Sequence, residues 1–425
     1  MKKCLLFIIL FITIISNINV YGNDLNLNCS SDILIDGESG RVLYDNNMNK
    51  KIYPASLTKL LTALTVLDLG SLDDILIVDD ETPFEIDGSH IALEPGEKLT
   101  LEDMLNGLLI ASGNDVAEVI AKNYSSYDGQ FIELMNIKAE KLGAVNSNFV
   151  NPHGLHDDNH YTTAYDLSRI ALAAYNNDII SDIVNKTKYT INETNIKSEK
   201  RYIINTNKLL VGTGYGNQII INNRYVDMKY EGANGMKTGY TPKAGSCLIG
   251  SAEKNGFSLI SVVIKGNTLD VYTDTHNLLN YGFNLHEKIE LIDDKEFIQN
   301  IEISSGDSKY LSLISEDGLS RVIKSSEISS IKKVIEINDY TLPISKGEHL
   351  GDVKFFINDE LLGSVPIVST FKVAQVVVEE MNLTWFALKV IIFFILAILI
   401  FIIILRFINK YRLYKIRKNK KIRRY

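Results

Sequence analysis

The chain has 425 residues, and its formal net charge of −8 is spread very unevenly along them. The two N-terminal lysines contribute +2 and the last twenty residues +10, so residues 23–405 together carry −20. An acidic body of this kind argues against binding to nucleic acid and against electrostatic attachment to anionic lipid.

The first element is an apolar segment that follows two lysines. Lys2 and Lys3 precede an apolar run at residues 4–15, and Val20-Tyr21-Gly22 then gives a small-residue ending. A short core helix or an uncleaved anchor would have a similar composition, but the run is short for crossing a bilayer. The pattern is typical of a secretory signal peptide, which we expect at residues 1–22.

A helix that follows Pro54 carries the first reactive motif, Ser56-Leu57-Thr58-Lys59. Before it, residues 31–36 and 41–44 have the pattern of a β-hairpin turned at Gly37-Glu38-Ser39-Gly40. Apolar residues then recur at helical spacing between positions 57 and 67. The motif therefore lies at the N-terminus of a predicted amphipathic helix.

Ser56 and Lys59 are three residues apart, so they share a face of this helix and their polar atoms can approach each other. The helix dipole and the free N–H groups at this end favour an oxyanion. Lys59 can act as a base only if its pKa falls. Burial and a second nearby cation would both lower that pKa, and Lys237 is the candidate cation.

Two further motifs follow in order, Ser112-Gly113-Asn114 and Lys237-Thr238-Gly239. Each is weak alone: Ser-x-x-Lys recurs in this chain, Ser-x-Asn is also a helix cap, and Lys-Thr-Gly is also an ordinary turn. The ordered set supplies a nucleophile, a base, a proton relay and an anion clamp. It indicates serine acyl transfer.

The other predicted elements mix capped helices with strands. We expect helices after Thr100, at residues 167–175 with Thr163 and Asp166 at its capped start, and at residues 270–281. A hairpin of residues 246–252 and 257–265 should turn at Asn255-Gly256. From residue 284 to 372 the pattern changes to short alternating segments, which predict an all-β module.

Near the C-terminus, residues 386–405 are apolar except for Lys389. A segment of this length is long enough for a transmembrane helix. Residues 406–425 hold ten lysines or arginines and no acid, which predicts a cytoplasmic tail under the positive-inside rule. We therefore expect a cell-membrane protein with a single C-terminal span, whose body is extracytoplasmic.

Two cysteines remain after the signal segment, Cys29 and Cys247. They could pair in an oxidising compartment, but two buried free thiols are the simpler expectation. No metal-ligand pair stands at recognisable spacing, so we predict neither a metal nor a cofactor.

The three motifs and their flanks resemble the low-molecular-mass penicillin-binding proteins, specifically D-alanyl-D-alanine carboxypeptidases of the penicillin-binding protein 5 type. The likeness includes Pro54-Ala55 before the nucleophile, Asn151-Pro152-His153-Gly154-Leu155, and Tyr240-Thr241 after the third motif. It implies an α/β (α+β) penicillin-binding/β-lactamase-like catalytic domain at residues 23–283, with an antiparallel sheet flanked by helices. A small all-β domain at residues 284–375 and one transmembrane helix would follow.

The resemblance also implies a role for each site residue. Ser56 would be acylated by the terminal D-Ala-D-Ala of a peptidoglycan pentapeptide stem, Lys59 would take its proton, and Ser112 would protonate the departing D-alanine. Asn114 would hold the substrate amide and orient Lys59. Lys237 and Thr238 would bind the terminal carboxylate of the substrate. Gly239 would leave room for the substrate beside the strand, and the backbone N–H of Tyr240 would bind the oxyanion. β-Lactams would be covalent inhibitors. Asn151 to Leu155 would be structural, with His153 hydrogen-bonded.

The chain also departs from the family pattern. The segment Asn205-Thr206-Asn207 lacks the arginine that many members carry at its centre, and residues 266–276 lack a second one. Residues 211–233 form a longer segment than usual, and Arg224 within it is a candidate replacement.

Three alternative functions use the same first step. A β-lactamase would need a Glu-x-x-x-Asn loop between Ser112 and Lys237, and the sequence has none. A membrane-anchored β-lactam receptor or wall-binding module would lack turnover, and its tail of about twenty residues is too short for a folded signalling domain. A transpeptidase would differ only in using an amine in place of water, which the motifs leave open.

Overall fold

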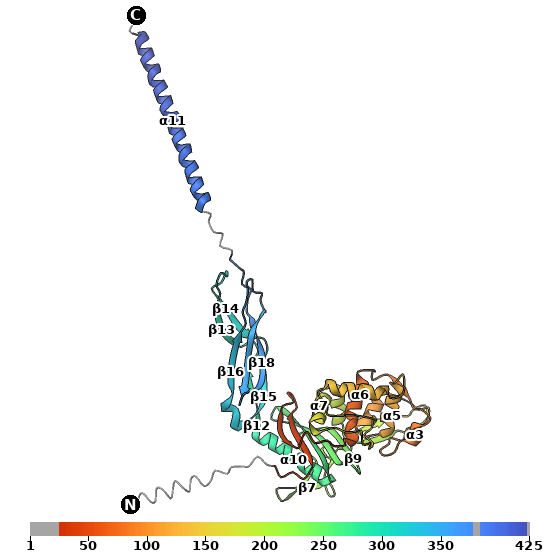
Figure 1. Ribbon diagram of the computed structural model, residues 1–425. Coiled ribbons are helices and arrows are strands. Elements are labelled where there is room, and N and C mark those ends of the chain that lie inside the picture. The colour runs from red at the N-terminus through yellow and green to blue at the C-terminus, as the bar shows by residue number, and fades with distance from the viewer. Residues whose placement is uncertain (1–24, 377–382, 423–425) are drawn as a thin grey trace, which may run out of the picture. The chain divides into compact units, whose positions relative to one another are not determined.

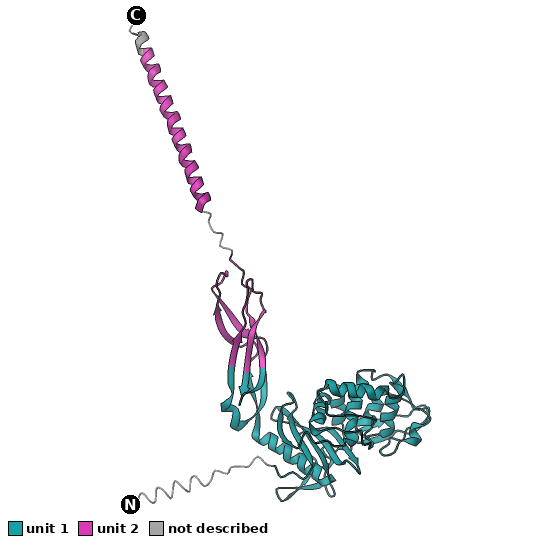
Figure 2. Ribbon diagram, in the orientation of Figure 1, with its two compact units in different colours: residues 1–292, 319–333, 355–363 teal, residues 293–318, 334–354, 364–425 magenta. Residues whose placement is uncertain are grey.

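The computed structural model describes residues 25–376 and 383–422, which divide into two compact units. Figure 2 colours these units: the first holds the described residues up to 292 with 319–333 and 355–363, and the second holds 293–318, 334–354 and the described residues from 364 on. The predicted signal segment, residues 1–22, lies outside the described residues.

A five-stranded antiparallel sheet forms the centre of the first unit, in the order β2-β1-β11-β10-β9. The predicted hairpins are confirmed: β1 pairs with β2, and β10 pairs with β11 through a turn at Asn255-Gly256, where both residues have positive φ. The strands of this sheet are β1 (Ser31–Asp36), β2 (Val42–Asn46), β9 (Ala233–Thr241), β10 (Gly245–Lys254) and β11 (Phe257–Gly266).

Both faces of this sheet are covered by helices, because its strands are apolar on both sides. In β1, Ile33 and Ile35 pack with the core under helices α2 and α7, whereas Leu34 packs with the core under α10. Figure 1 shows α10 on one side of the sheet and α5, α6 and α7 gathered on the other. The predicted α+β layout is therefore confirmed.

The helices of this unit are η1 (Ala55–Leu57), α2 (Thr58–Leu67), α3 (Thr82–Glu85), α4 (Leu101–Leu109), α5 (Asn114–Asn123), α6 (Gln130–Lys141), α7 (Ala164–Tyr175), α8 (Asp178–Asn185), α9 (Lys208–Val211), α10 (Thr268–Leu285) and η2 (Ser325–Ser330). Thr100 and Thr163 cap α4 and α7 as predicted, each accepting from the backbone N–H three residues on. Short paired strands complete it: β3 (Ile75–Ile77) with β4 (Lys98–Thr100), β5 (Lys188–Ile191) with β6 (Arg201–Ile204), β7 (Gln218–Ile221) with β8 (Arg224–Asp227), and β12 (His286–Ile292) with β15 (Leu319–Lys324).

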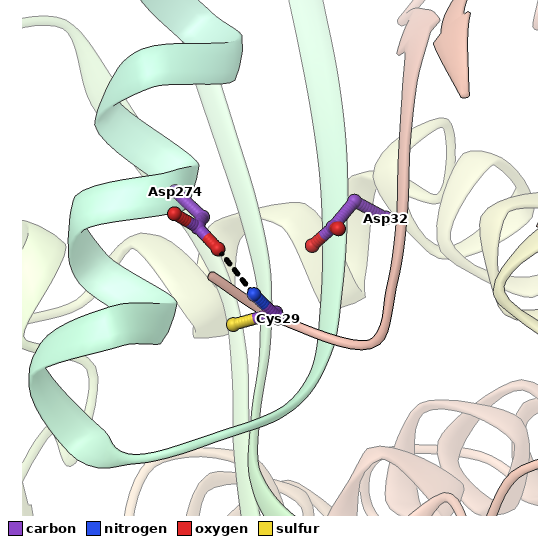
Figure 3. A group of neighbouring side chains, drawn as sticks. All are labelled: Cys29, Asp32 and Asp274. Atoms are coloured by element: carbon purple, nitrogen blue, oxygen red, sulfur yellow. Dashed lines mark hydrogen bonds between the residues drawn. The ribbon is translucent and has the colours of Figure 1, made fainter. Parts of the chain in front are cut away.

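Within the first unit, Asp274 of α10 binds the backbone of the segment that precedes β1 (Figure 3). One of its carboxylate oxygens accepts from the backbone N–H groups of Asn28 and Cys29, at 2.7 and 2.8 Å. Cys29 and Cys247 are both free and buried, which confirms the simpler of the two expectations. Burial also raises the pKa of each thiol, so both remain protonated and inert.

The remaining strands form a five-stranded sheet in the order β13-β14-β18-β17-β16, in agreement with the predicted all-β module. They are β13 (Phe297–Glu302), β14 (Tyr310–Ser315), β16 (Lys332–Ile337), β17 (His349–Ile357) and β18 (Glu360–Ser369). Helix α11 (Leu383–Ile422) is apolar and long enough to cross a membrane. The helix continues past residue 405, where the predicted membrane span ends, because lysine and arginine are themselves good helix formers.

Candidate active site

Ser56 lies in the short helix η1, directly before α2, and lines a cavity of about 500 Å³. Close packing of a distant loop fixes this position. A Cβ atom on Gly154 would lie 1.9 Å from the carbonyl oxygen of Ala55, and Gly154 has a φ of +88°. Only glycine meets both conditions, so the loop can pack directly against the backbone of Ala55 and Ser56.

Lys59 is fully buried, and its ammonium donates to three oxygens that come from three separate segments. These are Ser56 Oγ at 2.9 Å, Asn114 Oδ1 at 2.6 Å and the carbonyl oxygen of His153 at 2.8 Å. An ammonium has three donors, so all of them are used. Release of the proton shared with Ser56 leaves the nitrogen held by the other two bonds and aimed at the hydroxyl.

Two effects lower the pKa of Lys59 well below its usual value. Burial disfavours the charged form, and the ammonium of Lys237 repels it further, with a smaller opposing effect from Asp115. Burial also lowers the pKa of Lys237, to about 7. The predicted perturbation of Lys59 by burial and a second cation therefore has both of its physical causes in the structure.

The second motif faces the same cavity from the loop before α5. Ser112 is almost fully buried, has a φ of +63° and lines the cavity together with Asn114. The side-chain nitrogen of Asn114 donates to the carbonyl oxygen of Asp87 at 2.6 Å, and its backbone N–H donates to that of Ser89 at 2.6 Å. One N–H of the Asn114 amide thus remains for another acceptor.

The third motif lies on β9, which is an edge strand of the sheet. Lys237 is buried and donates to the carbonyl oxygen of Thr238 at 3.0 Å, while the Thr238 hydroxyl lies 2.8 Å from the hydroxyl of Thr206. A Cβ on Gly239 would lie 3.1 Å from the backbone nitrogen of Ser56, so glycine permits this close approach. Tyr240, which is exposed, lines the cavity beside it.

The sequence did not indicate that the carbonyl of His153 would bind Lys59. The loop at residues 151–155 was expected to be structural, and its His153 ring is hydrogen-bonded as predicted, accepting from the N–H of Leu155 at 3.1 Å. Burial lowers the pKa of His153 to about 3, so the ring is neutral. Because carbonyl contacts come from the backbone, no residue type could have signalled this one.

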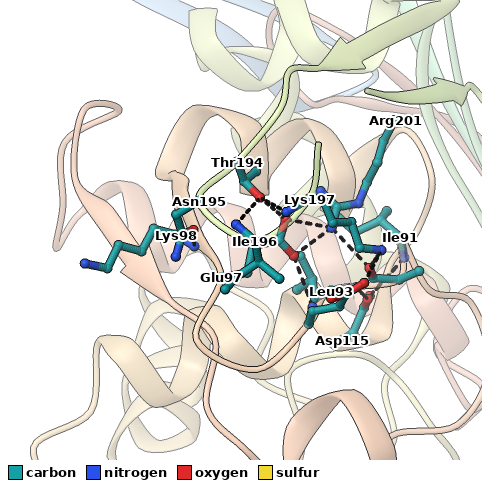
Figure 4. A network of polar contacts seen from close by, with 12 residues as sticks. Ile91, Leu93, Glu97, Lys98, Asp115, Thr194, Asn195, Ile196, Lys197 and Arg201 are labelled. Carbon is teal, nitrogen blue, oxygen red and sulfur yellow. Dashed lines mark hydrogen bonds and ion pairs between the residues drawn. The ribbon is translucent and has the colours of Figure 1, made fainter. Parts of the chain in front are cut away.

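A buried polar network holds the loop that carries the partners of Asn114 (Figure 4). Asp115 accepts from the backbone N–H groups of Ile91 and Leu93, at 3.1 and 3.2 Å. Glu97, which is fully buried, accepts from the Arg201 guanidinium through both carboxylate oxygens, at 2.7 and 2.6 Å. The network thus connects β6 to the loop that ends beside the active site.

Replacement of Arg201 by alanine is expected to destabilise the protein, because Glu97 would keep its buried charge without its partner. Breaking a buried pair in this way costs about 3–5 kcal/mol. The free energy of unfolding measured in urea should fall accordingly, and the exposed Arg224→Ala variant should serve as an unchanged control. An unaltered midpoint for Arg201→Ala would contradict the assignment.

The candidate replacement for the missing arginines was wrong. Arg224 is exposed on the β7–β8 hairpin, and the cavity lining in the described chain does not include it. Lys208 lines the cavity instead, directly after the Asn205-Thr206-Asn207 segment. From residues 266–276, the second segment without an arginine, the residues that line the cavity are Thr268, Val271 and Tyr272.

Comparison with known proteins gives the same family for both parts of the chain. Residues 19–268 match the family model of the S11 peptidases, described as D-alanyl-D-alanine carboxypeptidase, and residues 286–375 match the C-terminal domain of penicillin-binding protein 5. The chain is 31% identical to D-alanyl-D-alanine carboxypeptidase DacF of Bacillus subtilis, over 80% of this chain and 84% of that protein. It is 29% identical to DacC of Escherichia coli, over 79% and 82%.

Among solved structures, penicillin-binding protein 5 of Haemophilus influenzae matches with a TM-score of 0.66 and 25% identity, over 83% of this chain and 100% of that one. A single-site mutant of the Streptomyces K15 DD-transpeptidase matches with a TM-score of 0.55 and 27% identity, over 62% and 100%.

Proposed function

The chain belongs to the D-alanyl-D-alanine carboxypeptidases of the S11 serine peptidase family, and on that premise we propose a role for each residue of its active site. It is a serine-type carboxypeptidase with a penicillin-binding/β-lactamase-like fold and a C-terminal all-β domain. Family membership does not assign roles to individual residues of this chain, so we infer them from their geometry.

Ser56 attacks the carbonyl carbon between the two D-alanines of the peptidoglycan pentapeptide stem, and neutral Lys59 accepts the proton of its hydroxyl. The 2.9 Å contact and the lowered pKa of Lys59 support this pairing. As the C–N bond breaks, Ser112 passes a proton to the departing D-alanine. Water then hydrolyses the ester on Ser56 and regenerates the enzyme.

The substrate is held by the second and third motifs. The remaining N–H of the Asn114 amide donates to the substrate's backbone, and the N–H groups of Ser56 and Tyr240 bind the oxyanion. The close approach of Gly239 to the Ser56 nitrogen supports this arrangement. Lys237 and Thr238 contribute to binding of the terminal carboxylate.

Residues 23–283 form the catalytic domain and residues 284–375 the β-rich domain, a division supported by the two family matches. The apolar helix α11 is compatible with a membrane anchor. We place the catalytic domain outside the cell membrane and the basic residues 406–425 in the cytoplasm, on the strength of the charge asymmetry around this helix.

The hydrogen-bonded chain Ser56–Lys59–Asn114, whose first and last members line the cavity, is the observation that carries this proposal. A membrane-impermeant fluorescent penicillin should label the protein on intact protoplasts, and peptide mapping should locate the adduct on Ser56. The purified protein should release D-alanine from a muramyl pentapeptide. Labelling only after permeabilisation would indicate the opposite topology, with the catalytic domain in the cytoplasm. An adduct without D-alanine release would indicate a receptor. No adduct at all would contradict the site.

A further inference from the structure

The cavity at Ser56 has one charged side chain in its described lining, Lys208. The other lining residues are neutral: serines, threonines, glycines, aliphatic and aromatic residues, Asn114 and Cys247. Lys59 and Lys237 are buried behind this surface, at 0% and 1% exposure. An anionic substrate group that enters the cavity therefore meets Lys208 as the accessible positive charge.

Two contacts hold the backbone of Lys208 in place. Asn207 caps α9 by accepting from the N–H of Leu209 at 3.0 Å, and the N–H of Lys208 donates to the Tyr272 hydroxyl at 3.0 Å. Tyr272 is itself buried in α10. The lysine thus extends from a fixed base, while its ammonium has no hydrogen-bond or ion-pair partner among the residues that the structure describes.

Residues with hydroxyl groups line the same cavity as Lys208. Thr206, two residues before Lys208, pairs its hydroxyl with that of Thr238, and Thr268 lines the same cavity. A cation together with hydroxyl donors is the chemistry that binds a carboxylate. Lys237 is less suited to act alone, because its ammonium already donates to a backbone carbonyl and its pKa has fallen to about 7.

We propose that Lys208 forms the ion pair with the C-terminal carboxylate of the substrate and so selects peptides that end in a free carboxylate. The inference rests on the proposed function of the Ser56 site and adds a specificity residue to it. It also accounts for binding of this anion by a cavity whose described lining contains no arginine.

The proposal separates two steps of the reaction. The carboxylate belongs to the D-alanine that leaves when Ser56 is acylated, so Lys208 has no partner in the acyl-enzyme that remains. Loss of Lys208 should therefore slow acylation and leave deacylation unchanged. A merely structural role would alter both steps.

The test compares Lys208→Gln with Lys208→Arg and with Lys229→Gln, which removes an exposed charge outside the cavity. Using the full-length protein and a pentapeptide that ends in D-Ala-D-Ala, Lys208→Gln should lower the second-order acylation rate roughly tenfold or more. The deacylation rate should stay the same, and Lys208→Arg should restore most of the loss. Added salt should weaken acylation of the wild type more than that of Lys208→Gln.

Each outcome has a distinct meaning. Equal acylation rates for Lys208→Gln and Lys229→Gln, with an active wild type, would overturn the role of Lys208 alone. A loss in both acylation and deacylation would show a structural role and would also overturn it. Absence of D-alanine release by the wild type would instead refute the proposed function of the site.

Discussion

Replacing Ser56 with alanine is expected to abolish both the penicillin adduct and the release of D-alanine. The hydroxyl lies 2.9 Å from the buried Lys59, Ser56 lines the cavity, and in the proposed mechanism this hydroxyl is the group that becomes acylated. Removing the nucleophile of a serine hydrolase typically costs a factor of about 10,000 to 1,000,000 in kcat. D-Alanine release from a muramyl pentapeptide, measured with a coupled amino-acid oxidase, should therefore fall to background.

The chain offers a matched control for this experiment. Ser329 and Lys332 repeat the Ser-x-x-Lys spacing, but Ser329 is exposed in η2 and is not part of the described cavity lining. Ser329→Ala should retain full activity and full penicillin labelling. Residual labelling of Ser56→Ala that maps to another serine would contradict the assignment of the nucleophile.

Replacing Lys59 with arginine is expected to lower the acylation rate by at least about 1,000-fold while keeping a positive charge in place. Arginine is not deprotonated in proteins, so it cannot accept the proton of Ser56. General-base catalysis is typically worth about 100- to 10,000-fold, and the larger side chain would also disturb the contacts to Asn114 and His153. Stopped-flow acylation by a chromogenic penicillin would measure the loss, with Lys332→Arg as the control.

The pH dependence of the wild type gives an independent measure of the same role. The neutral form of Lys59 is the active base, so acylation should slow as the pH falls through the pKa of this group. Because burial and Lys237 lower that pKa well below the usual 10.5, the rate should reach its plateau far below pH 10.5. An acylation rate that still rises through pH 10 would show that Lys59 is not perturbed in this way.

Local sequence patterns predicted much of this fold correctly. The turn residues Asn255-Gly256 and the caps at Thr100 and Thr163 depend only on neighbours within a few residues, and all three lie where expected. The antiparallel sheet between two helical layers also agrees with the prediction. Helix α11 includes the span predicted at residues 386–405 and extends beyond it, because a basic run can continue a helix as readily as an apolar one.

The sequence by itself determined that Ser56 and Lys59 meet, because the two residues lie only three positions apart and their contact is local. Only the tertiary structure decided what surrounds them. The carbonyl of His153 reaches Lys59, and Lys208 reaches the cavity wall, from positions 94 and 149 residues after Lys59, through packing that no local pattern encodes. For the same reason the sequence analysis named Arg224 and did not point to Lys208: only the folded chain separates the exposed hairpin from the cavity wall.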